Sequence, residues 1–221
     1  MLRFAWAGLA LAALVAAYWL LKPRFQRTQE EIAARRLMNP ARLTAAPAFV
    51  LGPVFSPDGL RLAYASDAGS GMLSIWIHPL AGGQPVRLTD GLTHASDPDF
   101  SPDGQWIVYR SDQGGSLVVA SLDGRQSRRI AANGRRPRFS PDGKWIAYYE
   151  VVGAGQGRLF LIPSRGGDPK PLQPDFPLAQ APIWVSPSQI LFDGANAQHE
   201  GDWWIASLDG GAPIQTHATA R

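Results

Sequence analysis

The sequence contains no cysteine, and this absence excludes disulfide bonds, thiolate metal sites and cysteine nucleophiles. Charged residues are also scarce, at 18% of the 221 residues. The positive charge lies at one end, because residues 1–44 carry a net charge of +5 and residues 45–221 carry −2. A body with net negative charge disfavours nucleic-acid binding, which depends on a basic surface.

Glycine and proline are abundant instead, with 23 and 19 residues. Together they suit many short strands joined by tight turns, and long helices are unexpected outside the N-terminal segment. The hydrophobic content of 45%, which includes 8 tryptophans, is enough for a real core. The composition therefore predicts a globular, all-β body.

The N-terminal segment has one long apolar run. Residues 4–21 are all apolar, small or aromatic, and as a helix they span about 27 Å, enough to cross the hydrocarbon core of a bilayer. We predict a single transmembrane helix in residues 1–22, followed by a juxtamembrane helical spacer in residues 23–45. The alternative is a signal peptide that is cleaved after Val15-Ala16-Ala17, although the apolar run continues through Leu21.

The body of the chain is built from an internal repeat. The pentapeptide Phe-Ser-Pro-Asp-Gly occurs three times, at residues 55–59, 100–104 and 139–143, and an eroded fourth copy keeps Ser-Pro at residues 186–187. The serines of the four copies are 45, 39 and 46 residues apart. This period is typical of one propeller blade.

Each copy of the pentapeptide predicts a hairpin turn, in which proline presets φ and glycine is free to adopt φ > 0. A strand with a proline precedes each turn, and further apolar runs follow it, separated by Gly-containing turns. Four strands per unit, repeated radially, predict a β-propeller. We expect a propeller domain at residues 46–221, with four blades at residues 46–90, 91–131, 132–173 and 174–221.

The motif Pro-x-Phe-Ser-Pro-Asp-Gly, followed by an Ile-Ala-Tyr-like strand, resembles the WD-like propeller repeats of TolB-like proteins. The resemblance covers about residues 47–217, and it implies the same propeller fold. Propellers of that family usually close with six or more blades. Four units therefore predict an incomplete ring, an unusually small propeller, or a homo-oligomer that completes the ring.

Motifs for catalysis and metal binding are missing from the sequence. There is no Gly-x-Ser-x-Gly elbow and no room for a hydrolase domain. The repeated Asp58, Asp103 and Asp142 are interpreted as turn residues. The histidines are dispersed singly, without metal-ligand spacing: His78, His94, His199 and His217. We predict no catalytic, cofactor-binding or metal-binding residues, and we expect that the protein is not an enzyme.

Three weaker features remain. An acidic loop with Asp90, Asp97 and Asp99 is interpreted as turn-forming rather than as a Ca²⁺ site. Trp203-Trp204 should place one ring between blades and the other outward, toward a partner. The densest charge cluster fits either an anionic ligand, lipid or acidic partner, or a solvated rim with salt bridges, and we prefer the second; it contains Arg125, Arg128, Arg129, Arg135, Arg136 and Arg138.

A membrane helix followed by these repeats also resembles the C-terminal part of transmembrane transcriptional regulators and kinases. We expect a non-enzymatic, single-pass protein of the inner membrane, whose propeller binds a protein or small ligand as a sensory or scaffold ectodomain in the periplasm. The resemblance carries this topology, whereas Lys22, Arg24 and Arg27 favour a cytoplasmic body. The alternative is a secreted, soluble periplasmic TolB-like protein.

Overall fold

The computed structural model describes residues 48–112, 114–153 and 156–218, and every regular element within these ranges is a β-strand. Residues 46–221 form one compact unit. The predicted transmembrane helix and helical spacer lie outside the described residues. In the described part of the chain, no helix is long and apolar enough to cross a membrane.

The strands of this part form four antiparallel sheets of four strands each. The first blade contains β1 (Val50–Phe55), β2 (Arg61–Ser66), β3 (Ser74–Pro79) and β4 (Val86–Arg87). The second contains β5 (Ala95–Phe100), β6 (Trp106–Ser111), β7 (Ser116–Ser121) and β8 (Ser127–Ala131). The third contains β9 (Arg135–Phe139), β10 (Trp145–Val152), β11 (Gln156–Pro163) and β12 (Lys170–Leu172). The fourth contains β13 (Leu178–Ser186), β14 (Gln189–Ala195), β15 (Gly201–Ser207) and β16 (Ile214–Gln215).

Strand order follows chain order in every sheet, which confirms the predicted blades of four strands. The fourth strand of the first blade is short and ends at Arg87. Beyond it, the Thr89 hydroxyl accepts a hydrogen bond from the Ile75 N–H at 3.1 Å. A side chain thus replaces the backbone partner there, and the regular ladder stops.

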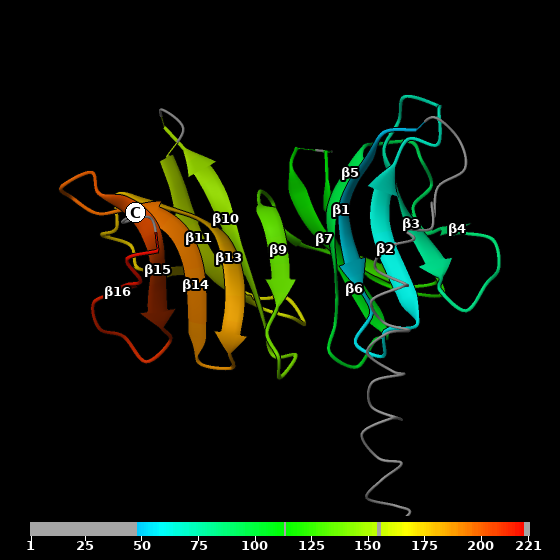
Figure 1. Cartoon of the computed structure of the whole chain (residues 1–221). Helices are drawn as coiled ribbons and strands as arrows, with labels where there is room; N and C mark the ends of the chain where they lie inside the picture. Colours follow the sequence, from blue (N-terminus) through cyan, green and yellow to red (C-terminus); the bar gives the residue numbers. More distant parts are fainter. Residues whose placement is uncertain (1–47, 113, 154–155, 219–221) are drawn as a thin grey trace, which may run out of the picture. The chain divides into compact units, whose positions relative to one another are not determined.

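The inner strands hold neighbouring blades together. β5 packs against β1 and β2, β9 packs against β5 and β6, and β13 packs against β9, β10 and β11. The blades therefore follow one another in chain order. The first and the fourth blade lie at opposite ends of the propeller body (Figure 1). Among the closely packed strand pairs of the described ranges, none joins the fourth blade to the first. The four-bladed propeller is an open arc.

The Ser-Pro-Asp-Gly turns are built as predicted. In the first blade, the Gly59 N–H donates to the Ser56 carbonyl at 2.8 Å, and Gly59 has a φ of 68°. The Ser56 hydroxyl donates to Asp58, whose carboxylate also accepts the Leu60 N–H at 2.9 Å. The same pattern recurs around Ser101 and Ser140. The serine and aspartate together close each hairpin between the first two strands.

A β-bulge interrupts each inner strand at its proline. The pairing register shifts there in all four blades, because proline offers no N–H to the ladder. The residue before the proline has a φ between 46° and 55° in each case: Gly52, Asp97, Arg136 and Ala181. For the three that are not glycine, this left-handed backbone costs about 1 kcal/mol each. The bulge redirects the side chains that follow it along the strand.

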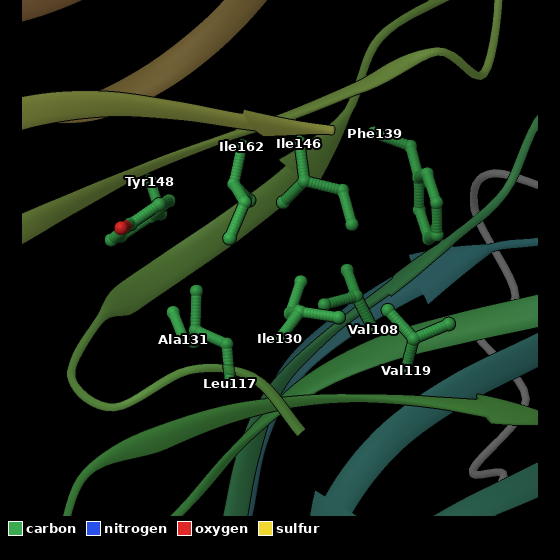
Figure 2. Close-up of a cluster of buried hydrophobic side chains, with 9 residues drawn as sticks. All are labelled: Val108, Leu117, Val119, Ile130, Ala131, Phe139, Ile146, Tyr148 and Ile162. Atoms are coloured by element: carbon green, nitrogen blue, oxygen red, sulfur yellow. The ribbon is translucent and has the colours of Figure 1, made fainter. Parts of the chain in front are cut away.

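Apolar side chains fill the spaces between successive blades. Figure 2 shows the cluster between the second and third blades, where Leu117 and Val119 face Ile146 and Ile162. Tyr148 is fully buried in the same cluster. Its hydroxyl oxygen is shielded from solvent and has no hydrogen-bond partner, and burial raises the pKa of Tyr148 well above its ordinary value. The hydroxyl therefore pays a desolvation cost that no contact offsets.

Replacing Tyr148 with phenylalanine should stabilise the protein. The Tyr148→Phe change keeps the ring in place and removes the unsatisfied hydroxyl, so the free energy of unfolding should rise by about 1 kcal/mol. Chemical denaturation measures this change. The matched control is Tyr149→Phe on the half-buried neighbour, which should leave stability nearly unchanged. A loss of stability in Tyr148→Phe would show that the hydroxyl has a favourable partner.

Replacing Asp142 with alanine should open the turn of the third blade. The Ser140 hydroxyl donates to Asp142 at 2.7 Å, and the Lys144 N–H donates at 3.1 Å. These bonds lower the pKa of Asp142 to about 2, below the unfolded value of about 4. At pH 7, Asp142→Ala should lower the free energy of unfolding by about 1 kcal/mol.

The pH dependence of this effect has a defined sign. A carboxylate with a lowered pKa contributes stability above its unfolded pKa, and that contribution disappears as the pH falls from about 4 to about 2. The difference between wild type and Asp142→Ala should shrink over this range in denaturation curves. Asp142→Asn, which keeps an acceptor oxygen, should lose less stability at pH 7. An equal effect of Asp142→Ala at both ends of the range would contradict this account.

Candidate functional site

A pocket of about 670 Å³ lies between the second and third blades, on the side of the Ser-Pro-Asp-Gly turns. We call it the turn-side pocket. Two of these turns and the β11–β12 turn form its rim, and strands of both blades form its floor. Its lining residues are Ser101, Pro102, Asp103, Trp106, Val119, Gln126, Arg128, Phe139, Pro141, Asp142, Gly143, Ser164 and Arg165.

Arg128 is the most constrained cation in the turn-side pocket. Its guanidinium lies over the Trp106 ring, 5.2 Å from the ring centroid, and one terminal nitrogen donates to the Ser164 carbonyl at 2.8 Å. The hydrogen bond to Ser164 joins the second blade to the third, whereas Trp106 belongs to the same blade as Arg128. The Nε atom is buried and has no acceptor. Arg128 is thus held in place, and its Nε–H could donate a hydrogen bond to a bound carboxylate.

The rest of the pocket combines apolar surface with charge. Val119 and Phe139 present apolar atoms to it, and Arg165 adds an exposed guanidinium. The carboxylates of Asp103 and Asp142 are already occupied by turn hydrogen bonds, which lower the pKa of each. The arrangement suits a ligand that buries an apolar group and presents an acceptor to Arg128.

The six arginines of the predicted cluster do not form one patch. Arg128 lines the turn-side pocket, Arg135 lines a second pocket, and Arg138 lies on the inner strand beside Pro137. Arg125 forms an exposed ion pair with Asp123 at 3.7 Å. Because neighbouring residues of a strand point to opposite faces, sequence proximity did not place these side chains together.

Two of the predicted loop aspartates belong to a strand. Asp97 and Asp99 lie in β5 rather than in an acidic loop, because the bulge before Pro98 lets the strand continue past the proline. Asp97 accepts the Arg136 N–H at 3.3 Å, and Asp99 accepts the Phe139 N–H at 2.8 Å. These carboxylates therefore link β5 to β9, the inner strands of neighbouring blades.

Asp99 carries the clearest electrostatic perturbation among these groups. Burial raises its pKa to about 6, although the Arg138 guanidinium and the Phe139 N–H oppose this shift. The Arg138 nitrogen is 3.9 Å from the carboxylate, so the ion pair is loose. Its position between two inner strands makes Asp99 a structural carboxyl whose charge costs stability at neutral pH.

The second pocket lies near the β6–β7 turn and has a volume of about 510 Å³. It is polar, with Arg110 paired to Asp112 and with Glu150 and Arg135 among its lining residues. Burial raises the pKa of Glu150. Sequence reasoning missed both pockets, since their side chains come from separate blades and meet only after the blades pack.

The remaining sequence features are placed as follows. His94 accepts the Leu73 N–H at its Nδ1 atom at 3.1 Å, and His78 Nδ1 is buried without a partner. In the ranges that the structure describes, no three residues of His, Cys, Asp or Glu are grouped to hold a metal ion. Trp204 packs in the core between the third and fourth blades, while Trp203 lies on the opposite face of its sheet, which confirms the predicted orientations.

Four antiparallel four-stranded sheets, packed in succession by their inner strands, define a β-propeller. The sequence profile of the TolB beta propeller domain matches residues 23–196. The chain therefore belongs to the TolB β-propeller domain family. Among curated proteins, no sequence matches the chain significantly.

Solved structures share this fold at low identity. TolB from Acinetobacter baumannii is 20% identical with a TM-score of 0.65, over 77% of this chain and 44% of that one. A puromycin-hydrolyzing peptidase from Mycobacterium tuberculosis is 16% identical with a TM-score of 0.64, over 79% and 30%. An oligogalacturonate lyase in complex with manganese is 17% identical with a TM-score of 0.58, over 74% and 51%. The chain spans less than two thirds of the length of each.

The sequence led us to expect that the protein is not an enzyme. This inference from the repeats is wrong, because propellers of this fold also occur in enzymes. The same fold is found in solved enzymes, including the peptidase and the lyase just described. Identities of 16–17% show the shared fold alone, so neither activity is assigned to this chain. A fold that hosts both binding proteins and enzymes does not separate the two classes.

Replacing Asp99 with asparagine should remove a defined part of the pH dependence of stability. The folded pKa of about 6 is higher than the unfolded value of about 4. Proton binding therefore stabilises the fold below pH 4, and this contribution is lost as the pH rises through 6, by up to about 1.4 kcal/mol per pH unit. Asp99→Asn keeps an acceptor for the Phe139 N–H and has no such loss.

Denaturation curves between about pH 4 and pH 7 test this prediction. The difference between Asp99→Asn and wild type should grow in favour of the variant as the pH rises. Asp142→Asn is the matched control, because its carboxyl pKa is shifted in the opposite direction. A constant difference between Asp99→Asn and wild type would mean that Asp99 titrates with an ordinary pKa.

Proposed function

We propose that this chain is a protein-binding propeller, held at the inner membrane by its N-terminal segment with the blades in the periplasm. The turn-side pocket is the observation that carries the proposal. It combines an apolar floor with a fixed guanidinium whose Nε lacks an acceptor. Because this donor is buried and unsatisfied, a partner's carboxylate that reaches the guanidinium would gain a charge-assisted hydrogen bond.

The position and size of the pocket favour a protein segment as ligand. Its volume of about 670 Å³ lies within the range of ligand pockets, and its rim consists of exposed turns that a large partner can reach. Trp106 and Phe139 offer apolar surface for a large side chain, while Arg128 and Arg165 offer charge for an acidic one. The expected partner segment carries both an apolar and an acidic residue.

The N-terminal segment supports the membrane part of the proposal. The apolar run of residues 4–21 is long enough to span a bilayer as a helix. A soluble periplasmic protein, cleaved after Val15-Ala16-Ala17, agrees equally well with the propeller. The two arrangements differ in the mass of the mature chain and in its fractionation, and both leave the turn-side pocket unchanged.

Site-specific photocrosslinking in cells tests the binding function. A photoreactive residue at Gln126, which lines the pocket and is exposed, should give a discrete protein adduct. The same residue at Arg158, exposed on β11 and outside the pocket, should not. Adding Arg165→Glu should reduce the Gln126 adduct by about tenfold, because a charge reversal at an interface rim repels an acidic partner. Arg129→Glu is the matched control, since Arg129 is exposed and does not line the pocket.

The outcomes separate the parts of the proposal. Equal adducts at Gln126 and Arg158, or an adduct that resists Arg165→Glu, would contradict binding in the turn-side pocket. Fractionation of the same cells gives the location. An intact chain in the membrane fraction supports the anchor, and a soluble chain that starts near Tyr18 supports the cleaved form.

A further inference from the structure

The second pocket brings two oppositely charged side chains to one blade interface without pairing them. Arg110 lies on β6 opposite Leu117 of β7, and Glu150 lies two residues after Tyr148 on the same face of β10. Leu117 and Tyr148 belong to the apolar cluster between the second and third blades (Figure 2). Because cross-strand partners and alternate residues of a strand share a face, Arg110 and Glu150 point into this interface from opposite blades.

Arg110 has one unused edge. Its Nη1 atom pairs with the Asp112 carboxylate. Its Nε atom is buried without an acceptor, and Nη2 has no hydrogen bond to any residue in the described part of the chain. Nε and Nη2 form the side-on edge of the guanidinium, which can bind a carboxylate through two parallel hydrogen bonds. A ligand's carboxylate can therefore bind this edge while Asp112 keeps its own contact.

Glycine keeps this edge of Arg110 open. Gly115, in the β6–β7 turn, has a φ of 78°, a left-handed conformation that other residues rarely adopt. A Cβ atom there would lie 3.5 Å from Nη2 and 3.9 Å from Nε of Arg110, so a side chain at this position would stand against the edge. The rim is held in place by Asn133, whose amide nitrogen donates to the Gly114 carbonyl at 2.8 Å in the orientation that matches donors to acceptors. The pocket is thus preformed beside Arg110.

Glu150 supplies the opposite charge. Burial raises the pKa of its carboxyl, and no cation among the described residues opposes this shift. Its cross-strand neighbour Arg158 is exposed, and within the described ranges the two side chains form no ion pair. A half-buried carboxylate of this kind gains from a cation that arrives with a ligand.

The lining of the second pocket balances positive and negative charge. It contains two arginines and two carboxylates, which are Arg110, Arg135, Asp112 and Glu150. A simple anion or cation would meet a like charge there, whereas a ligand that carries both charges meets a complementary group at each end. Among the described lining residues there is no aromatic side chain on which a nucleobase could stack. The chemistry of the pocket therefore favours a zwitterion.

We propose that the second pocket binds a small zwitterion, either a free amino acid or a short peptide. Its carboxylate binds the Nε–Nη2 edge of Arg110, and its ammonium group binds Glu150. The volume of about 510 Å³ lies within the range of ligand pockets and admits either ligand. This site is independent of the turn-side pocket, because the two pockets have no lining residue in common.

Isothermal titration calorimetry of the full 221-residue chain in mild detergent tests the ligand class. The probes are alanine, dialanine and trialanine, titrated to about 10 mM, and at least one should bind with a Kd of about 1 mM or below. The probe that binds most tightly distinguishes a free amino acid from a peptide. The matched controls are the same probe with its amino group acetylated and with its carboxyl group amidated. Each control should bind at least tenfold more weakly, because one charged contact is lost.

Substitutions in the pocket assign the two contacts. Glu150→Gln should weaken binding of the free zwitterion at least tenfold and leave the affinity for the acetylated probe unchanged. Arg110→Gln should weaken binding to the same extent and leave the affinity for the amidated probe unchanged. Arg158→Gln is the matched control, since Arg158 is exposed beside Glu150 and does not line the pocket; it should bind like wild type.

Circular dichroism checks that each variant folds, and Glu150→Gln decides the matter if Arg110→Gln does not fold. The absence of binding by all of the zwitterions would overturn the proposal. Equal affinities for free and capped probes, full affinity in Glu150→Gln, or an equal loss in Arg158→Gln would overturn it as well.

Discussion

The hydrogen-bonded turn between the first and second strands is the constraint on which the other features depend. Serine and aspartate close each turn by hydrogen bonds to each other and to the backbone. The closed turn fixes the pairing register of the second strand. The register decides which side chains of that strand face the preceding blade and which face the following blade. A slip of one residue would exchange the two faces. Because the turn recurs in three of the blades, the packing surfaces recur with it, and successive blades can stack by the same contacts.

The bulge at each inner-strand proline has a complementary effect. It places Asp97 and Arg136 in a left-handed backbone and lets the following residues point toward the neighbouring blade. Asp99 accepts the Phe139 N–H as a result, and a buried carboxyl connects two inner strands. The local strain is small compared with the apolar surface that the stacked blades bury. The same stacking brings Arg128 to the Ser164 carbonyl of the next blade and forms the turn-side pocket.

Much of the fold could be predicted because its signals are local. The pentapeptide repeat indicated the turns, and the alternation of apolar residues indicated the strands and the opposite orientations of Trp203 and Trp204. The site could not be predicted in the same way. Arg128 and Ser164 are 36 residues apart and meet only across a blade interface. The arginine-rich segment looked like one patch in the sequence, but strand alternation sends its side chains to different surfaces. Enzymatic function could not be judged from motifs either, because this fold serves binding proteins and enzymes alike.

The sequence by itself determined the repeat, the turn chemistry and the four-stranded blade, since each depends on residues close together in the chain. The tertiary structure alone decided which faces are covered. Leu161 and Ile205 occupy equivalent positions, yet one is buried by the next blade and the other remains half-exposed. The type of a residue sets its preference for burial. Whether a neighbouring sheet covers that residue depends on how distant parts of the chain pack.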